Sequence, residues 1–285
     1  MTIAIIGATG KLGGLTIDAL LDRGVPADDV LALGRDTERL AEFAERGLRT
    51  AIVDLDDVPG TAAALTDVDK LLLVSFGDLG GRVVQHGNAI DAAREAGVPH
   101  LVYTSGLHAP TTILGLAADH KATEELVTAS GIPATFLRNG WYTENHQQDF
   151  TSARENGVIA NSLGDGRLAT APRKDYAEAA AVVLSTPGHE GNAYELSGDT
   201  AWNSTEFAAT AQELLGRSVT YQPLTSARER EQLLSYGLDE GTADFMVALN
   251  ADLGNGAMAP TPGDLARLIG RPTEPLATTM KTWLE

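Results

Sequence analysis

Short apolar runs alternate with longer amphipathic stretches through the first half of the chain. Six runs rich in β-branched and other apolar residues predict strands at 3–6, 30–33, 50–53, 71–74, 101–103 and 134–137. Helical spacing of apolar positions lies between them, notably at 12–21, 38–46, 84–96 and 122–129. This alternation predicts an α/β protein with a doubly wound parallel sheet, the Rossmann fold.

The pattern changes past Asn139, where separate helices are expected at 177–184, 205–215 and 241–249. Short strands are expected at 194–196 and 219–222. We therefore predict an NAD(P)-binding Rossmann domain over residues 1–138, which can recruit later segments, and a smaller substrate-binding α/β lobe over residues 139–285.

Composition removes several classes of function. The chain has no cysteine, which excludes disulfides and thiolate chemistry and fits a cytoplasmic protein. Its formal charge of -18 opposes nucleic-acid binding, since that binding depends on Lys and Arg at phosphates. No apolar run approaches the roughly 20 residues that span a bilayer. We expect a soluble protein that starts at Met1 and inserts in no membrane. The histidines are scattered along the sequence, so we expect no metal site.

The most informative segment is the glycine-rich turn after the first predicted strand. Gly7, Gly10 and Gly13 follow that strand and open a helix. In such a turn the first glycine allows the tight bend, the second lets the backbone approach a pyrophosphate, and the third lets the helix pack on the sheet. The spacing predicts a dinucleotide site.

The residues after the next strands refine the choice of cofactor. Arg35 ends the second strand and favours the 2'-phosphate of NADPH, with Lys11 as a second positive charge. Asp36 is the competing observation, because an acid would suit a free ribose; its other role is to cap the following helix. Asp54 follows the third strand and is either an acceptor for the adenine amino group or an ordinary loop aspartate.

The usual catalytic pair of a short-chain dehydrogenase, a Tyr four residues before a Lys, is absent. Lys121 has Ala117 in that place. Reducing an ordinary ketone needs an acid, whereas a quinone yields a stabilised phenolate that solvent can protonate later. The sequence therefore favours a flat, electron-poor acceptor, helped by positioning and a neutral hydrogen-bond donor.

Several motifs resemble the NmrA-like branch of atypical short-chain dehydrogenases, and within it the bacterial NAD(P)H:quinone oxidoreductases of type 2. The motifs are GATG at 7–10, LLLVS at 71–75, YTSGLHA at 103–109, GIP at 131–133, RNGWYTEN at 138–145, GHEG at 188–191, YELSGD at 194–199, LIG at 268–270 and PT at 272–273. They extend through nearly the whole chain.

This resemblance implies a set of cofactor-binding residues. The diphosphate would lie on Gly7, Ala8, Thr9, Gly10, Lys11 and Leu12, the 2'-phosphate on Arg35, and the inner half of the cofactor on Ser75, Phe76 and Gly77. The nicotinamide would be flanked by Asn139, Gly140, Trp141, Tyr142, Thr143 and Glu144. Arg173 matches an arginine used toward the cofactor, or is a charge at a helix end.

Asn145 is the candidate catalytic residue, because its amide can polarise a quinone carbonyl; its alternative role is to cap the next helix. The resemblance implies NADPH as cofactor, with neither flavin nor metal, and a small aromatic quinone as substrate. Phe76 and Gly77 depart from the family pattern and leave the acceptor open. A redox sensor that binds NADP(H) without turnover and a dye or xenobiotic reductase are the alternatives. A homodimer and use of NADH are both compatible with the sequence.

Overall fold

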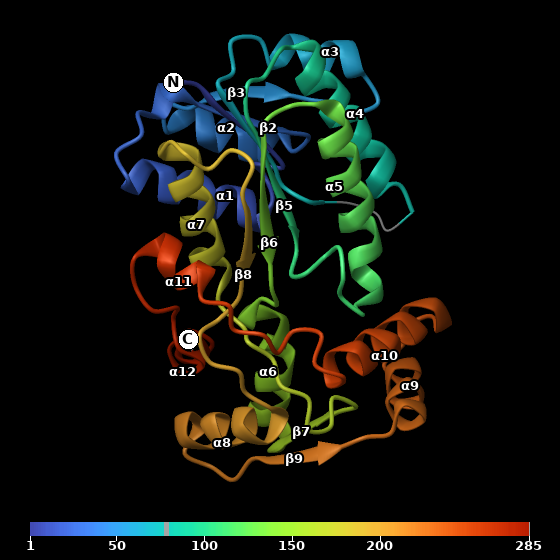
Figure 1. The fold of residues 1–285 in the computed structure, drawn as a ribbon. Coiled ribbons are helices and arrows are strands. Elements are labelled where there is room, and N and C mark those ends of the chain that lie inside the picture. The colour runs from blue at the N-terminus through green and yellow to red at the C-terminus, as the bar shows by residue number, and fades with distance from the viewer. Residues whose placement is uncertain (77–79, 285) are drawn as a thin grey trace.

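The computed structural model describes residues 1–76 and 80–284 and divides them between a sheet-based lobe and a smaller lobe (Figure 1). The main sheet has seven parallel strands in the order β3-β2-β1-β4-β5-β6-β8. They are β1 (Ile3–Ile6), β2 (Val30–Gly34), β3 (Arg49–Ile52), β4 (Lys70–Leu73), β5 (Leu101–Gly106), β6 (Ala134–Asn139) and β8 (Ala193–Leu196). The doubly wound Rossmann fold predicted from the sequence is confirmed.

Helices cover both faces of this sheet (Figure 1). One face carries α1 (Lys11–Asp22), α2 (Thr37–Glu45), α7 (Arg173–Ser185) and α11 (Asp264–Ile269). The other carries α3 (Val58–Ala64), α4 (Arg82–Glu95) and α5 (Ala118–Ser130). Every residue of β1, β2 and β4 is buried, which explains why these strands are continuous apolar runs in the sequence.

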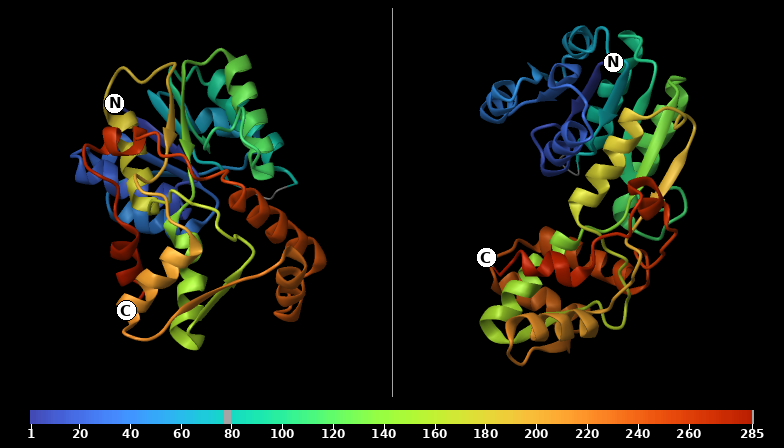
Figure 2. Two further views of the ribbon diagram at one scale, coloured as in Figure 1. Left: turned by 60° about the horizontal axis from the view of Figure 1, so that its bottom comes forward. Right: turned by 90° about the vertical axis from the view of Figure 1, so that its left-hand side faces the viewer.

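The second lobe lies beyond the carboxyl end of β6 (Figure 2). Its parallel pair β7 (Val158–Asn161) and β9 (Thr220–Pro223) accompanies α6 (Gln147–Asn156), α8 (Ser204–Leu215), α9 (Ser226–Ser235), α10 (Glu240–Gly254) and α12 (Leu276–Lys281). Short 3-10 helices lie at η1 (Ala27–Asp29), η2 (Gly115–Ala117) and η3 (Thr143–His146). A separate apolar core holds this lobe together. Among the described helices, none is long and apolar enough to cross a membrane.

The strand around Tyr194 corrects one expectation. The sequence predicts it in the smaller lobe, but it pairs with β6 and becomes the edge strand of the main sheet. Helix α7, also beyond residue 138, packs through Ala177, Ala180 and Leu184 into the core shared with α1. The sheet-based lobe is thus built from both halves of the chain.

Candidate functional site

The glycine turn has the geometry that a dinucleotide site requires. Gly7 adopts φ +89°, a left-handed conformation that favours glycine. A Cβ at Gly13 would lie 2.2 Å from the Gly7 carbonyl oxygen, so only glycine lets α1 start this close to the turn. The amino end of α1, which begins at Lys11, therefore faces the carboxyl edge of the sheet, where anions bind to helix termini.

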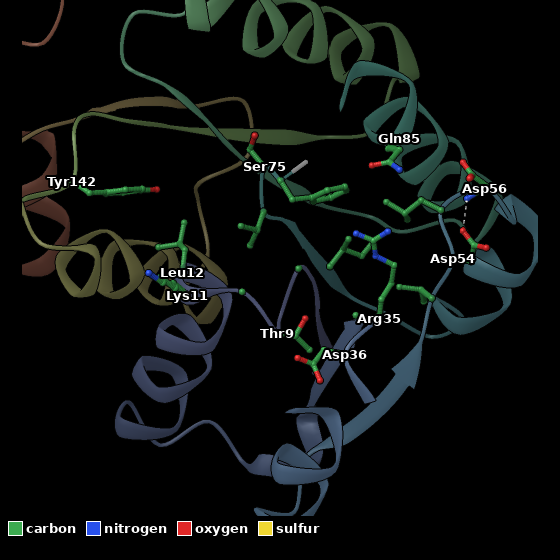
Figure 3. Close-up of a pocket in the computed structure, with 18 residues that line it drawn as sticks. Thr9, Lys11, Leu12, Arg35, Asp36, Asp54, Asp56, Ser75, Gln85 and Tyr142 are labelled. Atoms are coloured by element: carbon green, nitrogen blue, oxygen red, sulfur yellow. Dashed lines mark hydrogen bonds between the residues drawn. The ribbon is translucent and has the colours of Figure 1, made fainter. Parts of the chain in front are cut away.

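A cleft of about 460 Å³ opens in front of this turn (Figure 3). Its volume is in the range of small-molecule sites, about 300–1,000 Å³. The predicted cofactor residues that line it are Gly7, Thr9, Gly10, Lys11, Leu12, Arg35, Asp54, Ser75, Phe76 and Tyr142. Figure 3 shows Arg35 and Asp54 toward one end and Tyr142 toward the other, with Ser75 between them.

Both residues that follow β2 line the cleft, and Asp36 also caps the next helix. The Asp36 carboxylate accepts hydrogen bonds from the backbone N–H groups of Glu38 and Arg39, at 3.1 Å each, and so caps α2. Arg35 is exposed and lines the cleft. Lys11 lines the same cleft, and Figure 3 shows it beside Leu12.

The far end of the cleft meets a second pocket of about 310 Å³, hereafter the acceptor pocket. Ser75 and Tyr142 line both. Its other lining residues are Arg82, Thr104, Ser105, Gly106, Leu114, Leu116, His120, Asn139, Gly140, Trp141, Asn145, Arg173 and Met258. A cofactor in the cleft would thus present one end to a separate compartment large enough for a small ring system.

An ion pair lies at the amino-terminal end of α7, beside this pocket. The Glu144 carboxylate accepts from the backbone N–H of Arg173 at 2.9 Å and lies 3.7 Å from its guanidinium. The guanidinium also lies 4.6 Å from the centre of the Tyr142 ring, a cation–π contact. Burial raises the pKa of the Tyr142 phenol, which therefore stays protonated at neutral pH.

Asn145 is exposed, lines the acceptor pocket and has a defined orientation. Its Oδ1 accepts a hydrogen bond from Arg173 Nη2 at 3.1 Å. Because a guanidinium only donates, this contact fixes which end of the amide is oxygen and leaves the NH₂ group as a donor. Asn145 does not cap α6, which begins at Gln147 after His146.

Three predicted residues do not reach either cavity. Ala8 is buried, and its N–H donates to the Leu33 carbonyl at 3.2 Å. Thr143 is buried and donates to Thr170. The Glu144 carboxylate accepts from the backbone N–H of Arg173 and pairs with its guanidinium, as described. Gly77 lies outside the described residues.

Ser105, which ends β5 beside the pocket, is already engaged in a hydrogen-bond network. Ser105 Oγ donates to Glu124 at 2.6 Å, and Glu124 receives two hydrogen bonds from Arg138 at 2.7 and 2.9 Å. Arg138 also pairs with Glu195 at 2.7 Å. This largely buried network joins α5, β5, β6 and β8, and Ser105 brings it to the wall of the acceptor pocket.

Sequence reasoning missed Arg82 and His120 as pocket residues. Burial first, and the nearby positive charge of Arg82 next, lower the pKa of His120 to about 4. The imidazole is therefore neutral at neutral pH, and its Nδ1 lies 3.0 Å from the Tyr103 hydroxyl. Burial raises the pKa of Tyr103 to about 12. In the described part of the chain, no group of three or more His, Cys, Asp or Glu side chains is placed to hold a metal ion.

Comparison with known proteins agrees with this architecture. Residues 7–187 match a family described as NAD(P)H-binding. The chain belongs to this NAD(P)H-binding family. It is 44% identical to quinone oxidoreductase 2 of Escherichia coli over 96% of both chains. The structure of that protein complexed with NADPH superposes with a TM-score of 0.96 at 42% identity, covering 100% of each chain.

Two other relatives have names that refer to dyes. The triphenylmethane reductase of Citrobacter sp., solved with NADP(H), has a TM-score of 0.94 at 34% identity, with 99% of this chain and 100% of that chain covered. An NAD(P)H azoreductase of Xenophilus azovorans is 30% identical over 96% of this chain and 95% of its own length. All three relatives are named as reductases or oxidoreductases.

Proposed function

We propose that the protein is an NADPH-dependent, flavin-free oxidoreductase that reduces quinones by hydride transfer. The observation that supports this most is the pair of adjoining cavities, a dinucleotide cleft at the glycine turn and an acceptor pocket that meets it at Ser75 and Tyr142. The similarity to quinone oxidoreductase 2 over nearly the whole chain supports the same conclusion.

NADPH, when bound, supplies the hydride. The overall reaction is balanced by one proton from solvent: quinone, NADPH and a proton give hydroquinone and NADP⁺. The protein's part is to bind and orient both reactants. Gly7, Gly10 and the amino end of α1 would hold the diphosphate, and Arg35 the 2'-phosphate.

In the acceptor pocket, Asn145 would donate its amide N–H to a quinone oxygen, with Arg173 holding the opposite end of the amide. Such a fixed dipole stabilises the charge that develops on the oxygen without transferring a proton. The neutral His120 and protonated Tyr142 fit a pocket in which no side chain acts as a strong acid.

Reduction of triphenylmethane or azo dyes is a second candidate activity. It requires the same cofactor cleft and a flat, conjugated acceptor, and two relatives carry names of this kind. We propose that quinones are the preferred acceptors and dyes secondary ones. We also propose that the protein acts in the cytoplasm as a homodimer.

The direct test is NADPH oxidation by the purified protein, followed by the loss of the reduced nicotinamide absorbance. Flavin is removed first, and the uncatalysed rate is subtracted. Turnover that depends on menadione and saturates with it is expected. Tight NADPH binding without turnover across quinones and dyes would reject the enzyme in favour of a sensor.

A further inference from the structure

The acceptor pocket differs in charge from the rest of the molecule. The chain as a whole has a formal charge of -18. The residues that line the acceptor pocket, as far as the structure describes them, include two arginines, Arg82 and Arg173, and no aspartate or glutamate. Although the protein is strongly acidic, the side chains that line the pocket carry more positive than negative charge.

The two arginines are not equivalent. The charge of Arg173 is matched by Glu144, and its guanidinium is held by Asn145 and the Tyr142 ring. Arg82, the first residue of α4, is only 12% exposed. Within the described residues its nearest carboxylate is Asp119, at 3.9 Å, and its Nε is buried with no hydrogen-bond partner.

A mostly buried guanidinium that is weakly paired among the described residues is costly, because it has lost most of its water without gaining a full set of acceptors there. The neighbouring imidazoles do not share its charge. Burial and the charge of Arg82 lower the pKa of His120 to about 4 and that of His86 to about 3, so both rings are neutral at neutral pH. An anionic group on a ligand would supply an acceptor to the part of the guanidinium that lines the pocket.

We propose that the acceptor pocket selects quinones that carry a negative charge on the ring, and that Arg82 binds this charged group. The group could be an ionised ring hydroxyl, a carboxylate or a sulfonate, all of which offer oxygens that a guanidinium binds well. This inference rests on the proposed function, since it names the substrate class of the same reaction. Arg82 is then the specificity-determining residue, whereas Asn145 acts on the reacting oxygen.

Another role for Arg82 predicts a different result. If Arg82 stabilised only the charge that develops on the quinone oxygen, its loss would slow all quinones equally. If it binds a substituent, its loss would slow charged acceptors selectively. The two cases are separated by comparing one charged and one neutral acceptor in each variant, because the ratio cancels the intrinsic reactivity of each compound.

The experiment uses menadione and a naphthoquinone that carries one ring sulfonate. Arg82→Met should lower kcat/KM for the sulfonate by about 10-fold to 100-fold, the range expected for a hydrogen bond to a charged group. It should change menadione reduction little. Arg82→Lys should retain most of the preference. Arg167→Met removes the same charge from an exposed side chain that pairs with Glu206, and should leave both rates unchanged.

Equal losses for the two acceptors in Arg82→Met would overturn the inference and leave the proposed function intact. Absence of turnover with either acceptor in the wild-type protein would instead reject the proposed function. NADPH binding, measured by fluorescence, shows whether each variant is folded.

A measurement on the wild-type protein keeps the inference testable if Arg82→Met does not fold. Naphthalene sulfonate should inhibit menadione reduction competitively, and the neutral naphthalene sulfonamide of nearly the same shape should inhibit far less. Equal inhibition by the two compounds would also overturn the selection of charged ligands.

Discussion

Replacing Gly13 by alanine tests the tight packing of α1 against the glycine turn. The new Cβ would lie 2.2 Å from the Gly7 carbonyl oxygen and 2.8 Å from the Ala8 Cα, both backbone atoms that no side-chain rotation can move. Gly14, the next residue, provides the matched control. Its Cβ would meet nothing closer than 3.5 Å, and the nearest atom belongs to the flexible Arg39 side chain.

The magnitude follows from the difference between these two sites. Both substitutions exchange glycine for a better helix former, a gain of about 1 kcal/mol in a helix interior, so this effect largely cancels between them. What remains is the cost of overpacking, about 1–3 kcal/mol. Gly13→Ala should therefore be less stable than Gly14→Ala by that amount, and its NADPH affinity should fall because α1 is displaced from the turn.

Denaturant unfolding gives the free energy of each variant, and NADPH fluorescence titration gives its dissociation constant. Gly14→Ala is expected to match or exceed the wild-type stability. If Gly13→Ala proved as stable as Gly14→Ala and bound NADPH equally well, the close contact at Gly13 would not hold the cofactor site in shape.

Three further substitutions or conditions address the site. Arg35→Ala should raise the dissociation constant for NADPH by about 10-fold to 100-fold with little effect on NADH, and equal effects would remove Arg35 from the 2'-phosphate. Asn145→Ala should lower kcat with menadione roughly 10-fold while NADPH affinity is retained; unchanged turnover would contradict its role. His86 and His120 have pKa values of about 3 and about 4 in the folded protein, against 6.5 when exposed, so unfolding takes up protons in acid. Stability should therefore fall as the pH drops from about 6.5 towards about 4, and a flat denaturation midpoint over this range would contradict the burial of these rings.

The first half of the fold could be predicted because β1, β2, β4 and β5 are buried throughout and appear as largely apolar runs. Leu71, Leu72 and Leu73 are examples, each fully buried in β4. The ends of the strands were less visible. Thr104 and Ser105 extend β5 although they are polar, because Thr104 accepts from the Ser75 N–H and Ser105 donates to Glu124.

The arrangement in the second half depends on contacts that no local pattern contains. Tyr194 lies in a short strand that could have joined either lobe, and its pairing with Leu137 is set by tertiary packing. The glycine turn and Arg35 could be predicted because their chemistry is local to one strand–turn–helix unit. Arg82 could not, because its place in the pocket beside Ser75 and His120, three residues far apart in the sequence, is set by the tertiary fold.

The passage of the chain between lobes has a consequence for how the protein can be divided. A fragment ending at residue 138 would contain the glycine turn and Arg35 but would lack β8 and α7. It would leave the hydrogen-bonding edge of β6 and the apolar side of α1 uncovered, a combination that promotes aggregation. Residues 1–138 therefore do not form an independent folding unit. Recombination between family members would have to exchange α7 and β8 together with these residues.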